Sequence, residues 1–224
     1  MWRRDAGGRT LTFHLAGINN QNFIMRDEET GSYWQQISGR AIAGPMQGAS
    51  LKLVHSDELS FGLWRREQPD GSVLAPDSRY QAHYETADWE KSIGRMPTVI
   101  KTADRPAREI ELGLTSGPVA RAFPYERVRQ QKVVQDFVGS TPVVLVLGPD
   151  GISVRAFENR PPDGKPRDFY TDPDGTLIDS TGERWSFSGC SQQDSSRCLP
   201  QLDPIKDYWF DWKHYHPETT VYSQ

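Results

Sequence analysis

A sequence motif that occurs twice, roughly 150 residues apart, constrains the fold of this chain more than any other feature. The segment TGSYWQQISG begins at Thr30, and TGERWSFSGC begins at Thr181. Both have Thr-Gly, then a Trp (Trp34 or Trp185), then Ser-Gly. The match continues at identical spacings downstream, where Phe61, Trp64, Pro69 and Val73 align with Trp209, Trp212, Pro217 and Val221. This period is too long for a solenoid and predicts two related modules.

Each copy predicts the same order of elements: strand, turn, Trp-bearing strand, loop, helix and strand. Thr-Gly is typical of a turn, and aromatic residues at i and i+3 share one face of a helix. We expect Ser56 and Asp203 to cap the two helices and a Pro to end each one. The tryptophans can serve as core anchors or as a binding platform, and the sequence leaves both interpretations open.

The fold class that follows is α+β, with two related modules, each a mainly antiparallel β-sheet with one or two packed helices. We expect the first module at 1–104, lacking the front part of the repeat and ending in a linker excursion at 75–104, and the second at 105–224. Residues 143–147 and 152–157 predict a hairpin, and 125–137 predict a helix. The first module should expose a sheet edge that either the second module or a partner chain covers.

Composition excludes several classes of function. Aromatic residues make up 11% of the chain, which argues against disorder. The formal charge of −4 is spread along the chain, so we expect no nucleic-acid partner. No apolar run approaches the roughly 20 residues that span a bilayer. We find no nucleotide-binding or serine-nucleophile motif, and we expect no cofactor.

The two cysteines, Cys190 and Cys198, flank the polar loop SQQDSSR. This spacing favours a disulfide that would stabilise the fold by roughly 2–3 kcal/mol and would indicate an oxidising compartment. Two free thiols are the alternative. The spacing matches no usual zinc-ligand pair.

The segment LTFHLAGINNQNFIMRDEETGSYWQQISGRAIAGPMQG closely resembles the bacterial DUF3179 domain, a family of unknown function. VVQDFVGSTPVVLV resembles a second recurrent element of that family. The resemblance covers nearly the whole chain and implies an exported or membrane-associated bacterial protein. Family members commonly carry a Cys-containing loop after this strand, but here the position reads LGPDG, so any redox or metal chemistry of that loop is not expected.

The candidate binding residues are Asp27, Trp34, Gln35, Gln36 and Trp185. Asp27 opens an acidic cluster with Glu28 and Glu29 that could bind a cation or act in acid–base chemistry beside the glutamines. Turn stabilisation is the simpler interpretation of the cluster. His214 and His216 have a strand-like, same-face spacing that a metal pair could use, but they precede Pro217 near the end of a helix. We interpret them as surface residues and predict no metal site.

Two functional hypotheses remain. The first is a non-catalytic binding or assembly module of the periplasm or the extracellular space, which binds another protein chain or a glycan, or self-associates. Membrane association would come through a partner or through residues before Met1. The alternative is an enzyme or metal-handling protein with a site between the modules, near Asp27 and Trp34.

Overall fold

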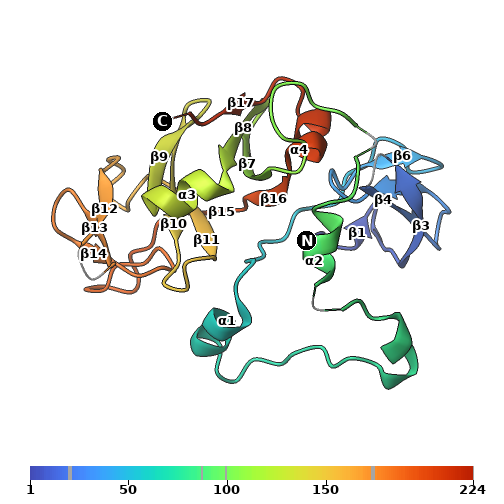
Figure 1. Ribbon diagram of the computed structural model, residues 1–224, viewed down its shortest axis with the longest axis horizontal. Helices are drawn as coiled ribbons and strands as arrows, with labels where there is room; N and C mark the ends of the chain where they lie inside the picture. Colours follow the sequence, from blue (N-terminus) through green and yellow to red (C-terminus); the bar gives the residue numbers. More distant parts are fainter. Residues whose placement is uncertain (20–21, 87, 99, 173–174, 224) are drawn as a thin grey trace.

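The computed structural model describes residues 1–19, 22–86, 88–98, 100–172 and 175–223. The protein is mostly β-sheet, with 36% of residues in strands and 14% in helices. Figure 1 shows the sheets in a row, with the first sheet at one end and the segment around α1 extending away from them. Antiparallel sheets with few helices were predicted and are confirmed, whereas the division into modules at residue 104 stays a prediction.

The first sheet is antiparallel and consists of β3 (Phe13–Asn19), β4 (Asn22–Asp27), β5 (Tyr33–Gln35) and β6 (Ala41–Ala43), in that order. A small hairpin of β1 (Asp5–Ala6) and β2 (Arg9–Thr10) precedes it. Trp34 and Ala41 form its buried cluster with Leu11 and Leu51. The sheet is followed by α1 (Phe61–Glu67), a 3-10 helix (Ser78–His83) and α2 (Trp89–Ile93).

The second half contains three more sheets. One orders β16 (Ile205–Tyr208), β7 (Ile110–Ser116), β8 (Val119–Pro124) and β17 (Thr220–Val221), with β17 parallel to β8. Another orders β15 (Gln201–Leu202), β11 (Val154–Glu158), β10 (Thr141–Leu147) and β9 (Val133–Val138). The third contains β12 (Phe169–Thr171), β13 (Leu177–Asp179) and β14 (Arg184–Trp185). The helices are α3 (Tyr125–Gln131) and α4 (Trp209–Tyr215).

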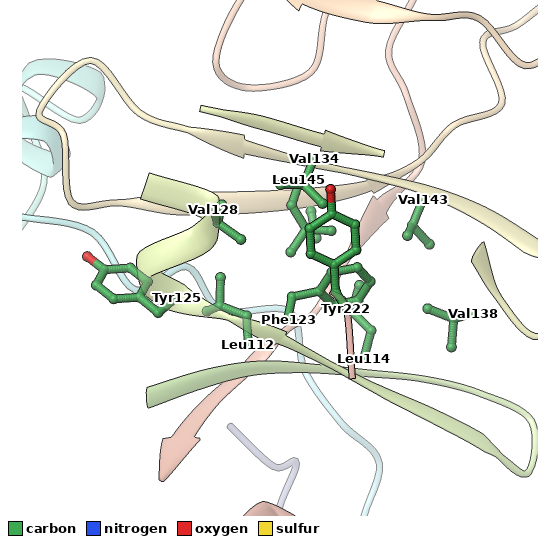
Figure 2. Close-up of a cluster of buried hydrophobic side chains, with 11 residues drawn as sticks. Leu112, Leu114, Phe123, Tyr125, Val128, Val134, Val138, Val143, Leu145 and Tyr222 are labelled. Atoms are coloured by element: carbon green, nitrogen blue, oxygen red, sulfur yellow. The ribbon is translucent and has the colours of Figure 1, made fainter. Parts of the chain in front are cut away.

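The largest buried cluster joins two of these sheets (Figure 2). Leu112, Leu114 and Phe123 come from β7 and β8, and Val134 and Leu145 come from β9 and β10. The predicted hairpin of β10 and β11 is confirmed, with β10 in the interior of its sheet, as its continuous apolar run requires.

The helix predicted over residues 125–137 is wrong in its second half. α3 ends at Gln131, and Lys132 takes a left-handed conformation with φ 65°. The following Val133 and Val134 belong to β9, because β-branched side chains fit a sheet that can bury them. A left-handed residue other than glycine costs on the order of 1–3 kcal/mol.

The predicted helix caps are also wrong. Ser60 caps α1 and accepts from the Leu63 amide, while α4 follows β16 directly without a side-chain cap. Ser56 and Asp203 therefore lie outside the helix starts. Val73 is 62% exposed and belongs to no strand, unlike its predicted counterpart Val221 in β17. α2 (Trp89–Ile93) lies within residues 75–104, the predicted linker excursion.

None of the helices in the described residues combines the length and the apolar character needed to cross a membrane.

The predicted Cys190–Cys198 disulfide is confirmed. The two residues face each other across an antiparallel bridge, and both are partly exposed. Leu199, beside Cys198, donates its amide to the Gly189 carbonyl. The bond therefore closes the loop beside β14.

Replacing both cysteines by serine should lower the free energy of unfolding by about 2–3 kcal/mol, because the loop is then unrestrained in the unfolded chain. Urea unfolding monitored by tryptophan fluorescence measures this loss. Wild-type protein in reductant is the matched control and should lose the same amount. An unchanged midpoint in both samples would contradict this prediction.

Candidate interface site

A cavity of about 430 Å³ lies where the first sheet meets the end of α4. Its walls are formed by Gln35, Ile37, Ser38, Arg40, Ala41, Ile42, Gln47, Gly48, Tyr215 and His216. In Figure 1, α4 lies between the first sheet and the sheet that contains β7 and β8. The cavity is therefore a feature of the interface between the two halves of the chain.

α4 is held against its sheet by Trp212. The indole ring covers Gly113 of β7, where a Cβ atom would lie 2.2 Å from the ring. The indole N–H donates to Thr219 Oγ1 at 2.9 Å, and the His216 ring centroid lies 4.0 Å from that of Trp212. This packing fixes the last turn of α4, which carries Tyr215 and His216 to the cavity.

Polar side chains from both halves of the chain line this cavity. The Arg40 guanidinium has no ion pair among the residues that the structure describes. The Tyr215 hydroxyl is buried beside the Gln35 side chain, which lies near enough to interact with it although the two form no hydrogen bond of ordinary geometry. Ser38 Oγ donates to Gln35 Oε1 at 2.7 Å, which fixes the Gln35 carboxamide beside Tyr215. Burial lowers the pKa of His216, so its ring is neutral near pH 7.

A pair of carboxyl groups lies behind Tyr215. Asp207 is the penultimate residue of β16 and Asp211 lies in the first turn of α4, within hydrogen-bonding reach of each other. Burial and the charge of Asp211 raise the pKa of Asp207 to about 7, and burial also raises that of Asp211. Asn22 Nδ2 of the first sheet donates to Asp211 Oδ2 at 2.5 Å. The bond from Asn22 to Asp211 thus connects the two halves of the chain.

A third buried carboxyl group, Glu111, lies across the strand pair from Asp207. Glu111 is fully buried, and Arg105 approaches its Oε1 at 3.1 Å. Burial raises the pKa of Glu111 to about 7, although the Arg105 charge opposes the shift. No group of three or more His, Cys, Asp or Glu residues in the described part of the chain is arranged to hold a metal ion.

Asp27 and Trp34 are brought together, but both are fully buried. Trp34 Nε1 donates to Asp27 Oδ2 at 2.7 Å, and the Thr30 amide donates to Asp27 Oδ1 at 2.5 Å. Burial opposes the charge of Asp27, but these bonds hold its pKa below the ordinary value. The acidic residue thus stabilises the turn, which is the simpler of the two interpretations that the sequence left open.

The second motif forms a similar set of bonds, with its aspartate two residues before the threonine instead of three. Trp185 Nε1 donates to Asp179 Oδ2 at 3.0 Å, and Thr181 donates its amide and its hydroxyl to Asp179 Oδ1 at 2.8 and 2.6 Å. Each indole also meets a phenyl ring edge-on, Phe13 in one case and Phe169 in the other. Gly39 and Gly189 both have positive φ and lie under an aromatic ring, that of Trp2 or Phe157.

The remaining candidates lie apart from one another. Gln35 lines the interface cavity, whereas Gln36 is exposed and accepts the Trp2 indole N–H through its backbone carbonyl. Trp185 is buried far along the chain, beside a different cavity. Glu28 and Glu29 are exposed, and Glu29 accepts the Thr12 amide.

Sequence reasoning missed Arg40, Tyr215, Glu111 and the pair of Asp207 and Asp211. One signal was available, because Asp211 interrupts the aromatic run Trp209, Phe210 and Trp212 on a helix expected to be buried. A carboxylate at such a position must be paired or protonated. The positions of Arg40 and Glu111 depend on contacts between distant segments.

The fold and the site thus define a mainly β protein with a polar cavity between a sheet and a helix from opposite halves of the chain. The chain belongs to DUF3179, a family described as proteins of unknown function, whose model matches residues 1–219. No curated protein and no solved structure matches it.

The buried acids give stability a defined pH dependence. The ordinary pKa values are 3.8 for Asp207 and 4.5 for Glu111, and folding raises both to about 7. Between about pH 4 and pH 7 the folded state therefore binds more protons than the unfolded state. Their contribution to the free energy of unfolding is greatest below about pH 4 and falls as the pH rises to about 7.

Asp207→Asn should raise the free energy of unfolding at pH 8 by about 1–3 kcal/mol, and should raise it clearly less at pH 5, where the folded-state carboxyl group is still protonated. The amide carries no charge to bury and keeps a donor for Asp211. Urea unfolding at both pH values measures the difference. Glu218→Gln, at an exposed carboxylate, is the control and should have no effect at either pH. An equal effect of Asp207→Asn at pH 5 and pH 8 would disprove the prediction.

Proposed function

We propose that this chain is a binding module that acts outside the cytoplasm and holds a small organic anion in the interface cavity. The observation that carries the proposal is Arg40, a guanidinium at the cavity wall without an ion pair among the described residues. A guanidinium binds a carboxylate through two parallel hydrogen bonds, which makes a carboxylate the favoured ligand group.

The other groups of the cavity fit such a ligand. Neutral His216 has one ring N–H to donate. Ile37 and Ile42 add apolar surface for the body of the ligand. Because the two walls belong to opposite halves of the chain, a bound ligand would also stabilise their association.

The compartment is inferred from the disulfide. A partly exposed Cys190–Cys198 bond persists in the periplasm or outside the cell, where thiols are not kept reduced. The resemblance to an exported bacterial family supports the same location.

We also infer that the chain arose by duplication of one unit. The support is the matching bonds of Asp27 with Trp34 and of Asp179 with Trp185. The two helices also end alike: the amides of Gln68 and His216 donate to the carbonyls of Trp64 and Trp212 with nearly equal backbone angles.

Assembly with a second protein chain is part of the proposal. The end of the β3–β4 hairpin carries three exposed apolar side chains: Leu15 is 63% exposed, Ile18 is 65% exposed and Phe23 is 47% exposed. β3 is also an edge strand, so its free backbone groups are open to pairing.

An enzyme with its site at this interface is the second candidate function. The pair of Asp207 and Asp211 favours it, because a carboxyl group whose pKa is raised to about 7, as that of Asp207 is, can act as an acid or a base near neutral pH. The pair lies beside Tyr215, which lines the cavity. Turnover of a bound ligand, lost in Asp207→Asn, would support this candidate over simple binding.

The binding proposal is tested by thermal unfolding with acetate, benzoate, succinate and citrate. At least one of these anions should raise the melting temperature of the wild type. Arg40→Gln should weaken its affinity roughly 10- to 100-fold, as expected for loss of a charged hydrogen bond. Arg66→Gln, at an exposed arginine of α1, is the matched control and should bind normally. Equal affinity in the wild type and Arg40→Gln would refute the proposal.

A further inference from the structure

A second cavity of about 430 Å³ lies between the β10–β11 turn and the β13–β14 hairpin. Leu147, Leu177 and Phe187 give it apolar walls, while Thr171, Thr176 and Gln192 add polar groups. Lys132 is the basic residue of the lining. The interface cavity shares no lining residue with this one.

The turn at one wall, residues 148–151, is held rigid by Asp150. Its carboxylate accepts the Ser153 amide at 2.9 Å, the Ser153 hydroxyl at 2.5 Å and the Ser60 hydroxyl at 2.6 Å. Burial opposes ionisation, but these bonds lower the pKa of Asp150 to about 2. The negative charge is therefore balanced by donors from the turn and from the start of α1.

The aromatic wall is equally fixed. The Phe187 ring lies so close to Gly148 that a Cβ atom there would be 3.0 Å from it. The Arg155 guanidinium lies 4.7 Å from the ring centroid and is itself held by Asp57 and Glu67. The ring therefore offers a fixed apolar surface to a ligand.

Lys132 occupies a position that favours glycine. Its φ of 65° at the end of α3 is left-handed, and Lys132 is the only residue other than glycine with positive φ among those that the structure describes. Its side chain is exposed and has no ion pair in the same set of residues. A lysine beside the carbonyl end of a helix gains a little from the helix dipole, but less than the left-handed conformation costs. Strain of this kind is concentrated at functional sites.

We propose that this cavity is a second binding site, for an organic anion with a flat apolar body. The body would lie against Phe187 between the turn and the hairpin, and Lys132 would pair with the charged group. The strained backbone then places the ammonium group at the cavity, which a glycine at residue 132 could not do. This site is independent of the proposed function of the interface cavity.

The test compares two fluorescent probes that differ by one charged group. 8-Anilinonaphthalene-1-sulfonate is a flat aromatic anion, and N-phenyl-1-naphthylamine is the same molecule without the sulfonate. Lys132→Gly should raise the melting temperature, because strain is relieved, and should weaken binding of the anion about fivefold or more. Its affinity for the neutral probe should stay within about twofold. Lys132→Arg should keep the affinity for the anion.

Amide shifts in NMR spectra locate the bound anion, and we expect them at Gly148 and Gly151. Arg40→Gln should bind the anion as the wild type does, so failure of the interface proposal would not affect this result. The inference is overturned if Lys132→Gly binds the anion as well as the wild type does, or if both probes lose affinity equally. It is also overturned if the shifts fall on the apolar end of the β3–β4 hairpin.

Discussion

The contact between the Trp212 ring and Gly113 is the constraint on which the interface depends. Any side chain at residue 113 would overlap the indole, so the sheet accepts α4 only because glycine lies beneath it. Once the helix is in place, Asp211 reaches Asn22 of the first sheet, and Tyr215 and His216 reach the cavity. Close-packed interiors transmit small shifts, so these groups would move together if the ring were displaced.

The buried acids give this interface its specificity more than its stability. Taking Asp207, Asp211 and Glu111 out of water is unfavourable, and Arg105 and Asn22 offset only part of the loss. An apolar interface of the same shape would be more stable, but it would let the first sheet shift along α4. A hydrogen bond from Asn22 to Asp211 instead requires one relative position of the first sheet and α4. That position is the one that forms the cavity.

Local patterns predicted much of the fold. Continuous apolar and alternating runs located β10 and β11, and aromatic spacing located α1 and α4. The end of α3 was missed because Lys132, not glycine, breaks the helix, and a lysine gives no local signal for a left-handed conformation. Asp27 and Trp34 were correctly associated, but the sequence could not show that their bond is internal to the turn. Arg40 and Tyr215 meet only because distant segments pack together.

Under the proposed duplication, α1 and α4 can be compared position by position. The comparison separates the residues that hold each helix in place from those that occur in one copy alone. With Trp64 aligned to Trp212, Leu59 and Leu63 of the first copy occupy the positions of Asp207 and Asp211 in the second. The shared parts are the tryptophan and the backbone geometry that ends each helix. Leucines at these positions would hold a helix in place without burying charge. On that alignment the framework does not require the acids, and the proposed function of the interface gives a reason for them.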